Sequence, residues 1–305
     1  MSDGSWTRVN SRSFFRGLLV LALLAFTSVG GMTAHATENG GSAYPNGAED
    51  FMAGAAPPPG NYFINYFNYY SAGTFKDGPP EFKLNVAADV LRFIHITDKQ
   101  FLGGLWGVHI FIPLVYMDLK MSGMSAHESR ASLGDIIVDP FILSWHGKNW
   151  HALTAVDMYM PTGNYTKSAG PRANVGRNYW TFEPIVAGTY VADCGFQVSG
   201  KFMYDFNTKN TDTDYLSGQE FHFDYAFGQK ISDFTLGMAG YYYQQTTDDE
   251  RNGTKIGNRG RVVAFGPAVK YDYKNMSFSF KYDFETAAKN RPEGDNLWLK
   301  FVYAF

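Results

Sequence analysis

The sequence predicts an all-β protein, a transmembrane antiparallel up-and-down β-barrel of about 12 strands. Tyr and Phe number 20 and 26, although the mean hydropathy of the chain is only −0.24. Strands that face lipid on one side and water on the other average to such a neutral value, and aromatic girdles raise the Tyr and Phe counts. The last ten residues form one such strand, whose apolar face consists of Leu297, Leu299, Phe301, Tyr303 and Phe305.

The start of the chain carries an export signal. Three arginines in the first 16 residues precede an apolar run over residues 17–26, and Ala34-His35-Ala36 has the small-x-small pattern of a signal-peptidase site. An uncleaved membrane anchor is the alternative, but the run is shorter than the roughly 20 residues that span a bilayer core. Residues 1–36 are therefore predicted to be a removed signal peptide.

Charge and cysteine content narrow the class of protein further. The formal net charge is −3, and the basic residues are scattered singly rather than gathered in blocks. Nucleic-acid binders carry a basic patch or stripe, so nucleic acid is excluded as a partner. Cys194 is the single cysteine, which leaves the exported chain without an intramolecular disulfide.

The clearest strands lie in the second half of the chain, over residues 221–228, 263–272, 277–285 and 296–305. In 277–285, for example, Phe278, Phe280, Tyr282 and Phe284 alternate with serines, Lys281 and acidic residues. A soluble barrel or sandwich would bury such an apolar face inside. This face is too aromatic and continuous to fill a narrow interior, so it is expected to face lipid.

Eight further segments complete the predicted barrel: 60–71, 81–96, 106–119, 134–145, 151–160, 178–192, 195–206 and 233–246. The total of about 12 is even, as single-chain bacterial barrels require. Two sets of aromatics, Tyr62, Tyr66 and Tyr70 in the first of these strands and Tyr241 to Tyr243 in the last, are assigned to an outward interface girdle. A stacking path for aromatic substrates is the alternative.

Connection lengths support this assignment. Short connections are predicted at 146–150, 193–194, 228–232 and 274–275. Longer polar loops rich in Gly, Asn, Asp or Thr are predicted at 161–174, 207–217, 247–258 and 287–295. Outer-membrane barrels have short periplasmic turns and longer external loops, so this alternation is expected if the N-terminus is periplasmic.

The segment 37–60 precedes the barrel, which is assigned to residues 61–305. Pro57-Pro58-Pro59 removes backbone donors and stops a β-ladder, so this segment is not a strand. It either occupies the lumen as a plug or lies on the periplasmic side.

Several motifs resemble those of the "meta-pathway of phenol degradation" family, a group of outer-membrane barrels encoded near genes of aromatic catabolism. The matching stretches are residues 38–54, Pro57-Pro58-Pro59-Gly60 leading into residues 62–66, Gly134-Asp135-Ile136, residues 140–145 and residues 159–165. The resemblance implies transport of hydrophobic aromatic compounds and carries over no catalytic residue.

The face opposite the lipid is expected to line the lumen. Its charged candidates are Asp89, Asp135, Asp139, Asp157, Glu183, Lys201, Asp205, Asp224, Lys270, Asp272, Lys281 and Asp283. Charged rings select solutes in pores, whereas charges paired across strands hold a wet interior together. The excess of acid disfavours an anion pore.

Enzymatic chemistry is not predicted. Ser144-Trp145-His146 suggests an outer-membrane phospholipase, but on the predicted topology it lies at a periplasmic turn and lacks an orienting acid. His146 and His151 flank that turn without a third metal ligand at regular spacing. No catalytic residue, metal site or cofactor is therefore assigned.

The sequence thus predicts a channel or transporter of the bacterial outer membrane for small hydrophobic or aromatic compounds. A lipid-acting enzyme and a structural or adhesive barrel are the alternatives. The expected partners are outer-membrane lipid, the solute, and the barrel-assembly machinery, which would recognise Phe301, Tyr303 and Phe305.

Overall fold

The structure is a computed structural model that describes residues 38–305 except 123, 125–126 and 168–171, all within the compact unit Ala34–Phe305. The predicted signal peptide, residues 1–36, lies outside the described residues. A short 3₁₀ turn, Glu38–Gly40, is the one helical element of the described chain. No described helix is long and apolar enough to cross a membrane.

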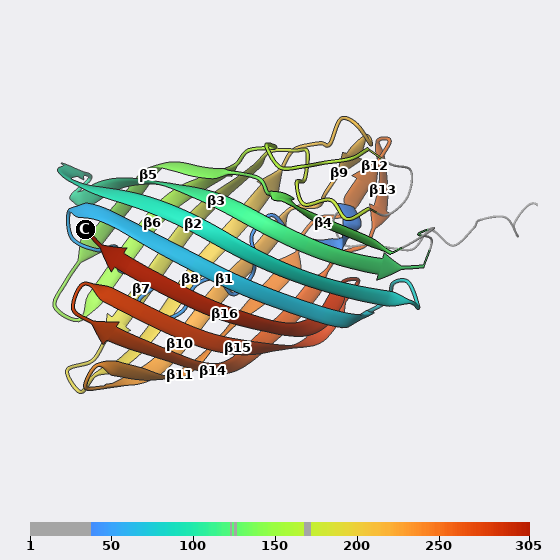
Figure 1. Ribbon diagram of the computed structural model, residues 1–305. Helices are drawn as coiled ribbons and strands as arrows, with labels where there is room; N and C mark the ends of the chain where they lie inside the picture. The colour runs from blue at the N-terminus through green and yellow to red at the C-terminus, as the bar shows by residue number, and fades with distance from the viewer. Residues whose placement is uncertain (1–37, 123, 125–126, 168–171) are drawn as a thin grey trace, which may run out of the picture. The chain divides into compact units, whose positions relative to one another are not determined.

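The described residues form a closed antiparallel barrel (Figure 1). Its strands are β1 (Gly60–Phe75), β2 (Phe82–Phe101), β3 (Gly104–Met121), β4 (Glu128–Leu133), β5 (Ile137–His146), β6 (Trp150–Tyr159), β7 (Thr181–Val191), β8 (Phe196–Asn207), β10 (Glu220–Ile231), β11 (Phe234–Gln245), β14 (Arg261–Tyr273), β15 (Met276–Lys289) and β16 (Pro292–Ala304). Each pairs with the next, except that β4 and β5 both pair with β3, and β1 pairs with β16 to close the ring. Because β4 and β5 follow one another along β3, the 13 strands occupy 12 positions. The predicted fold class is confirmed.

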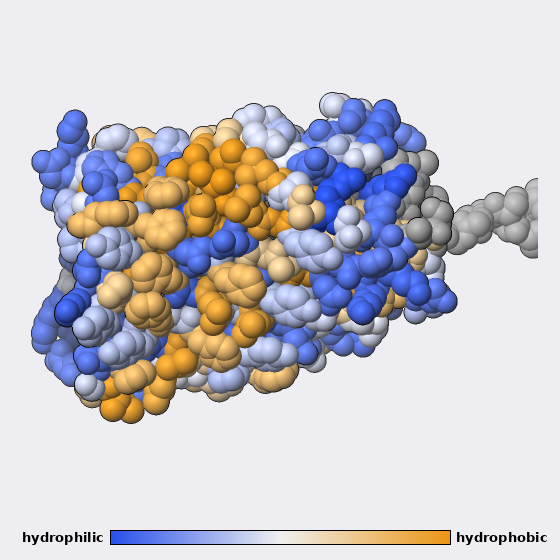
Figure 2. Space-filling view, in the orientation of Figure 1, coloured by the Kyte–Doolittle hydropathy of each residue, from blue (hydrophilic) through white to orange (hydrophobic). Residues whose placement is uncertain are grey.

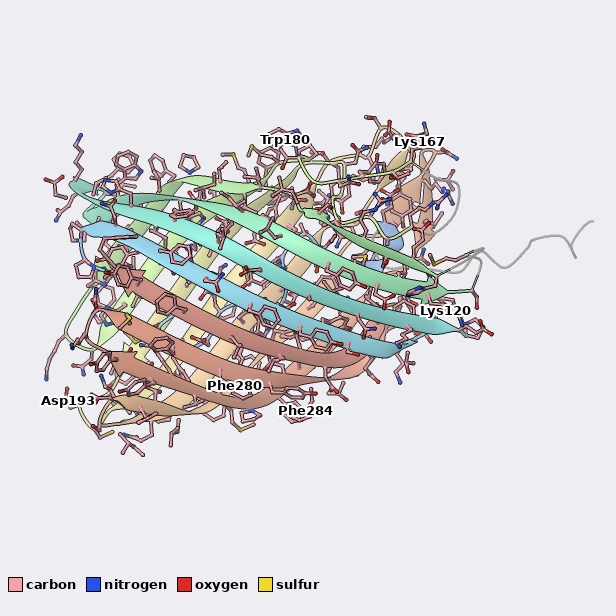
Figure 3. The ribbon with its side chains drawn as sticks, in the orientation of Figure 1. Lys120, Lys167, Trp180, Asp193, Phe280 and Phe284 are labelled. Carbon is pink, nitrogen blue, oxygen red and sulfur yellow. The ribbon has the colours of Figure 1, made fainter. Side chains whose placement is uncertain are left out.

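The two ends of the barrel differ. The connections 102–103, 147–149, 192–195, 232–233 and 274–275 lie at one end, which we call the short-turn end. The opposite end, the long-loop end, carries the connections 76–81, 122–127, 160–180, 208–219, 246–260 and 290–291. Asp193 and Lys120 mark the two ends in Figure 3. The predicted alternation of short and long connections is therefore present in most of the chain.

One predicted loop is wrong. Residues 287–295 are not a long loop, because β15 continues to Lys289 and β16 begins at Pro292. The strand ends separate here and each pairs with its other neighbour: Lys289 lies opposite Arg261 of β14, and Pro292 lies opposite Phe75 of β1. The polar composition of these residues hid their strand structure.

A second, small sheet was not predicted. It consists of β9 (Tyr215–Leu216), β12 (Asp249–Arg251) and β13 (Thr254–Gly257), and lies in the loops of the long-loop end (Figure 1). The Tyr215 hydroxyl donates a hydrogen bond to the buried carboxylate of Asp249 at 2.6 Å. Strands this short carry no alternation that a sequence pattern can detect.

The lipid-facing side is apolar where the sequence predicted it. Phe280 and Phe284 of β15 are 41% and 47% exposed on the outer side, whereas Lys281 and Asp283, which alternate with them, are 1% and 0% exposed (Figure 3). Figure 2 shows apolar side chains across the middle of the visible face and hydrophilic ones toward the two ends. This is the surface that a transmembrane barrel presents to a bilayer.

Strands β2 and β3 differ from β15, because their interior face is apolar as well as their outer face. The side chains on that face toward the long-loop end are Phe82, Leu84, Val86, Ala88 and Val90 of β2, and Phe111, Pro113, Val115, Met117, Leu119 and Met121 of β3. We call this set the apolar wall. A strand that is apolar on both faces shows no alternation, so its direction cannot be assigned from polarity alone.

Two assignments of side-chain direction are wrong for this reason. Tyr62, Tyr66 and Tyr70 of β1 face the interior rather than the lipid, because Phe67 and Tyr69 occupy the outer face and are equally aromatic. Tyr241 and Tyr243 of β11 are likewise buried, at 1% exposure each. Asp89 lies on the outer face of β2, since its neighbours Ala88 and Val90 line the interior. There the side-chain amide of Asn65 donates a hydrogen bond to Asp89, which lowers the cost of a polar group facing lipid.

Candidate functional site

The chain that precedes β1 lies inside the barrel, and we call residues 38–59 the lumenal segment (Figure 1). Asp224 of β10 accepts three of its hydrogen bonds, from the backbone N–H groups of Gly47 and Glu49 at 2.9 Å each and from the Tyr44 hydroxyl at 2.5 Å. Burial, together with the charges of Asp224 and Glu49, raises the pKa of Tyr44 well above its ordinary value. Tyr44 therefore stays protonated and remains a donor.

The same segment packs closely against β7 and β8. The backbone N–H of Met52 donates to Ser199 at 2.9 Å, and that of Gly54 donates to Thr189 at 3.0 Å. A Cβ atom on Gly54 would lie 2.5 Å from the backbone of Gly188, so a glycine is required at this close approach. The segment is thus fixed to the wall along its length.

Glu49 anchors the segment to the seam where the barrel closes. Its carboxylate lies 3.3 Å from Arg92 of β2 and 3.3 Å from Lys300 of β16, and it accepts a 3.0 Å hydrogen bond from Tyr66 of β1. Lys300 also binds Asp50 at 2.7 Å. Burial alone raises the pKa of the Glu49 carboxyl, but the charges of Lys300 and Arg92 outweigh it and lower the pKa to about 2.

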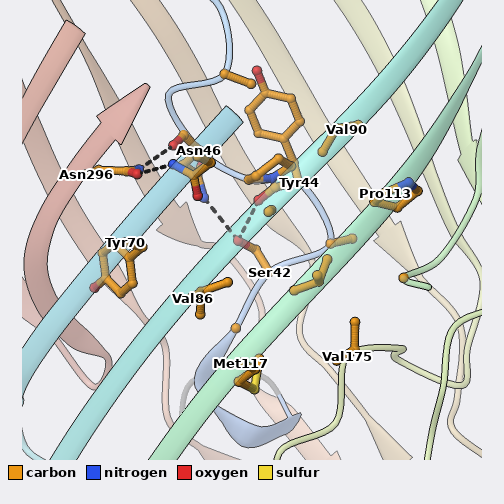
Figure 4. Close-up of a pocket in the computed structure, with 18 of the residues that line it drawn as sticks. Ser42, Tyr44, Asn46, Tyr70, Val86, Val90, Pro113, Met117, Val175 and Asn296 are labelled. Atoms are coloured by element: carbon orange, nitrogen blue, oxygen red, sulfur yellow. Dashed lines mark hydrogen bonds between the residues drawn. The ribbon is translucent and has the colours of Figure 1, made fainter. Parts of the chain in front are cut away.

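A cavity of about 300 Å³ lies between the lumenal segment and the apolar wall, toward the long-loop end. We call it the outer chamber; Val86, Val90, Pro113, Met117 and Val175 line one side of it in Figure 4. An apolar cavity of about 150 Å³ already holds a benzene molecule. The outer chamber therefore has the size and the lining to hold a small aromatic ring.

Polar atoms on the opposite side of the outer chamber are largely bonded to one another. The Asn46 side chain donates to Ser42 Oγ at 3.0 Å, and Ser42 Oγ donates to the Tyr44 carbonyl at 3.0 Å (Figure 4). Asn296 of β16 donates to the Asn46 carbonyl at 3.2 Å. These bonds stiffen the segment and leave the chamber with a mainly apolar character.

A second cavity, of about 710 Å³, lies toward the short-turn end and is called the inner chamber. Its lining includes the proline run 57–59 together with Ile94, Ile96 and Ile142. The two chambers share four lining residues: Glu49, Tyr66, Asp157 and Lys201. The lumenal segment thus divides the lumen at a polar constriction between two largely apolar chambers.

A chain of side-chain contacts crosses this constriction. Arg92, which binds Glu49, also lies 2.9 Å from His109 Nδ1 of β3, and His109 Nε2 lies 2.7 Å from Asp157 of β6. Asp139 of β5 accepts from backbone N–H groups and completes the group. The sequence analysis missed Arg92 and His109, although each is the polar exception on an otherwise apolar alternating face.

The predicted lumen residues lie at four kinds of position. Interior, buried positions are held by Asp139, Asp157, Glu183, Lys201, Asp205, Asp224, Lys281 and Asp283. Lys270 and Asp272 form an ion pair at 2.8 Å on β14, toward the short-turn end. Asp135, between β4 and β5, borders the outer chamber and accepts hydrogen bonds from the backbone of Gly163 and Arg177. Asp89 alone among them lies on the outer face.

The residues considered for enzymatic chemistry do not assemble. Ser144 Oγ is buried without a hydrogen-bond partner among the described residues. His146 Nδ1 faces His151 Nδ1 at 2.9 Å instead of Ser144, at the short-turn end. A nucleophile hydrogen-bonded to its base is the minimum of a triad-like site, and this pair lacks it.

The fold is a closed transmembrane β-barrel whose lumen is crossed by an internal segment. Comparison of the sequence with family models identifies the family. Residues 57–301 match the family described as "Putative MetA-pathway of phenol degradation", and the chain belongs to that family. The resemblance predicted from the sequence is confirmed. None of the curated proteins matches the chain significantly.

Two solved structures illustrate the fold. The chain is similar to the COG4313 outer membrane channel from Pseudomonas putida F1, with a TM-score of 0.74 and 16% identity, covering 84% of this chain and 100% of that one. It is also similar to the beta domain of the Bordetella autotransporter Brka, with a TM-score of 0.52 and 11% identity, covering 81% and 100%. At these identities the likeness is one of fold.

Proposed function

We propose that this protein is an outer-membrane channel for small hydrophobic or aromatic compounds. The observation that carries the proposal is the apolar wall, which replaces the polar interior usual for such barrels and forms an aromatic-sized chamber with Tyr66 and Tyr70. Membership of a family related to phenol degradation supports the same class of solute. The similar Pseudomonas putida structure is itself described as an outer membrane channel.

The proposed path starts at the long-loop end, which faces the exterior. An apolar solute leaves water for the outer chamber because transfer of its surface to an apolar lining is favourable. Passage to the inner chamber then requires the lumenal segment to move away from the constriction at Glu49. Movement follows the concentration gradient, since the mechanism needs no energy source beyond diffusion.

The proposal includes the location of the mature protein. Residues 1–36 are removed after export, residues 37–60 plug the lumen, and residues 61–305 cross the outer membrane with the short-turn end in the periplasm. Phe301 and Tyr303 lie on the outer face of β16, Phe305 follows its last residue, and the three serve as the assembly signal for the barrel machinery. The interior charges, most of them paired, hold the wall together rather than select ions.

Uptake into proteoliposomes tests this function. Vesicles containing the refolded mature protein should take up an uncharged radiolabelled monoaromatic such as phenol faster than protein-free vesicles. A hydrophilic sugar of similar size serves as the comparison, and it should enter more slowly. Equal rates for the two solutes, or no uptake above protein-free vesicles, would contradict an aromatic-selective channel.

A further inference from the structure

A second cluster of chemistry-bearing residues lies in the barrel wall beside the constriction, where Glu183 pairs with Asp157 in the strand register. Glu183 of β7, Asp205 of β8 and His222 of β10 are each 0% exposed and come from three adjacent strands. Glu220 of β10 lies directly opposite Asp205 in the strand register. We call the first three residues the buried triad.

The spacing of the buried triad fits metal coordination better than hydrogen bonding. His222 Nε2 lies 3.3 Å from an Asp205 oxygen and 3.5 Å from a Glu183 oxygen, beyond the usual 2.7–3.2 Å range of N–H···O bonds. Two ligand atoms that each lie 2.0–2.2 Å from a tetrahedral zinc ion are about 3.4 Å apart. One ligand atom from each residue lies within 4.8 Å of the other two.

Several polar atoms of the buried triad also lack hydrogen-bond partners. Both ring nitrogens of His222 and Oε1 of Glu183 are buried and make no hydrogen bond to any described residue. Besides His222, the buried Asp205 carboxylate meets the carboxyl groups of Glu183 and Glu220. Leaving buried carboxylates without partners costs several kcal/mol per ion. A cation bound between these atoms would remove that cost.

The neighbouring cluster at the constriction shows what a satisfied arrangement looks like. His109, Asp139 and Asp157 also converge, but His109 bonds Asp157 at 2.7 Å and Arg92 at 2.9 Å. Asp139 accepts hydrogen bonds from the backbone of Phe141 and Val156. That cluster therefore needs no metal ion to compensate its charges. The buried triad differs from it because its ring nitrogens lack hydrogen-bond partners.

We propose that Glu183, Asp205 and His222 bind one divalent transition-metal ion, for which Zn²⁺ is the probe. Imidazole with carboxylates suits such an ion better than Ca²⁺ or Mg²⁺, which prefer oxygen ligands throughout. The Tyr159 hydroxyl donates to Glu183 at 3.2 Å and orients it. The Tyr44 ring of the lumenal segment stacks on His222 with 5.1 Å between centroids, so the ion would lie directly beneath the plug.

The ion would therefore join three strands of the wall at the place where the plug rests. The sequence analysis could not find this site, because its ligands lie 22 and 17 residues apart on separate strands and show no ligand spacing. Only the strand register brings them together.

Calorimetric titration of Zn²⁺ into the refolded, chelator-treated mature protein tests the proposal. The exposed pair His146 and His151 could also bind zinc, so both are first changed to Gln, and heat-modifiability on gels confirms folding. This background protein should bind one Zn²⁺ per chain. His222→Gln should weaken binding at least tenfold, whereas His95→Gln, on the outer face of β2, should leave the affinity unchanged.

If His222→Gln does not refold, Glu183→Gln is measured in its place and should weaken binding by a similar factor. Absence of saturable zinc binding to the folded background protein would overturn the proposal. Unchanged affinity in the folded triad variant would overturn it as well.

Discussion

The two sides of the lumen differ in kind. The apolar wall on β2 and β3 presents aliphatic and aromatic side chains to the outer chamber, whereas the wall formed by β6, β7, β8 and β10 presents carboxylates and histidine. The lumenal segment lies between them, bonded to Asp224 on the acidic side. The difference teaches that the apolar wall offers a surface for an apolar solute, whereas the plug is held by polar groups, at Asp224 on the acidic side and by the contacts of Glu49 at the seam.

Removing the plug should produce the largest change. Deletion of residues 38–57 joins the two chambers, so the single-channel conductance in planar bilayers should rise several-fold over that of the mature protein. The acidic wall would then face open water. Unchanged conductance in a heat-modifiable deletion variant would show that the segment does not close the lumen.

A polar substitution in the apolar wall should weaken solute binding in the outer chamber. Val86→Asn places a polar group in the outer chamber and should weaken block of the current by a monoaromatic about tenfold, since burial of such a side chain contributes roughly 1.5–3 kcal/mol. Ile94→Asn is the matched control, because Ile94 lies on the same face of β2 but lines the inner chamber. Equal losses in the two variants would show that the outer chamber is not the binding site.

The ion pairs of Glu49 should give the plug a pH dependence. The pKa of this carboxyl is about 2 with the segment in place, against an ordinary value of 4.5 once the segment is released. Docking is therefore fully favoured above about pH 4.5 and weakens as the pH falls toward 2. The open probability in bilayer recordings should rise over that window.

Glu49→Gln removes the charge that titrates and should flatten this pH response while raising the open probability at neutral pH. If the open probability of Glu49→Gln still rises as the pH falls, the pH response comes from other titratable groups.

The smallest expected effect concerns the contact with β7. Gly54→Ala forces a Cβ atom against the backbone of Gly188 and should increase brief openings about two- to threefold, because the segment must shift to relieve the contact. Gly73→Ala is the matched control, since a Cβ there meets no atom within 4 Å. An equal increase in openings in both variants would show that the close contact between Gly54 and Gly188 does not hold the plug in place.

The strands of the second half were predictable from sequence because their two faces differ. In β15, aromatics and charges alternate, so both the strand and the direction of its side chains follow from the pattern. On β1 and β2 both faces carry apolar or aromatic residues, and the predicted directions of Tyr62, Tyr66, Tyr70 and Asp89 were wrong. Polarity cannot resolve a strand that meets lipid outside and an apolar chamber inside.

The site was predictable only in part. The lumenal carboxylates follow from alternation, but their partners depend on which strands become neighbours. Glu49 meets Lys300 across 251 residues, and Arg92 meets His109 through pairing of β2 with β3. No local pattern encodes such contacts, so the constriction and its two chambers appear only in the folded chain.

Single-channel recording with a monoaromatic solute added to one side tests the central claim most directly. The refolded mature protein should show discrete current steps that the solute blocks in a concentration-dependent manner, because the solute occupies the outer chamber. Val86→Asn should shift this block to higher concentration. Current steps that a saturating monoaromatic leaves unchanged in the folded protein would contradict the account.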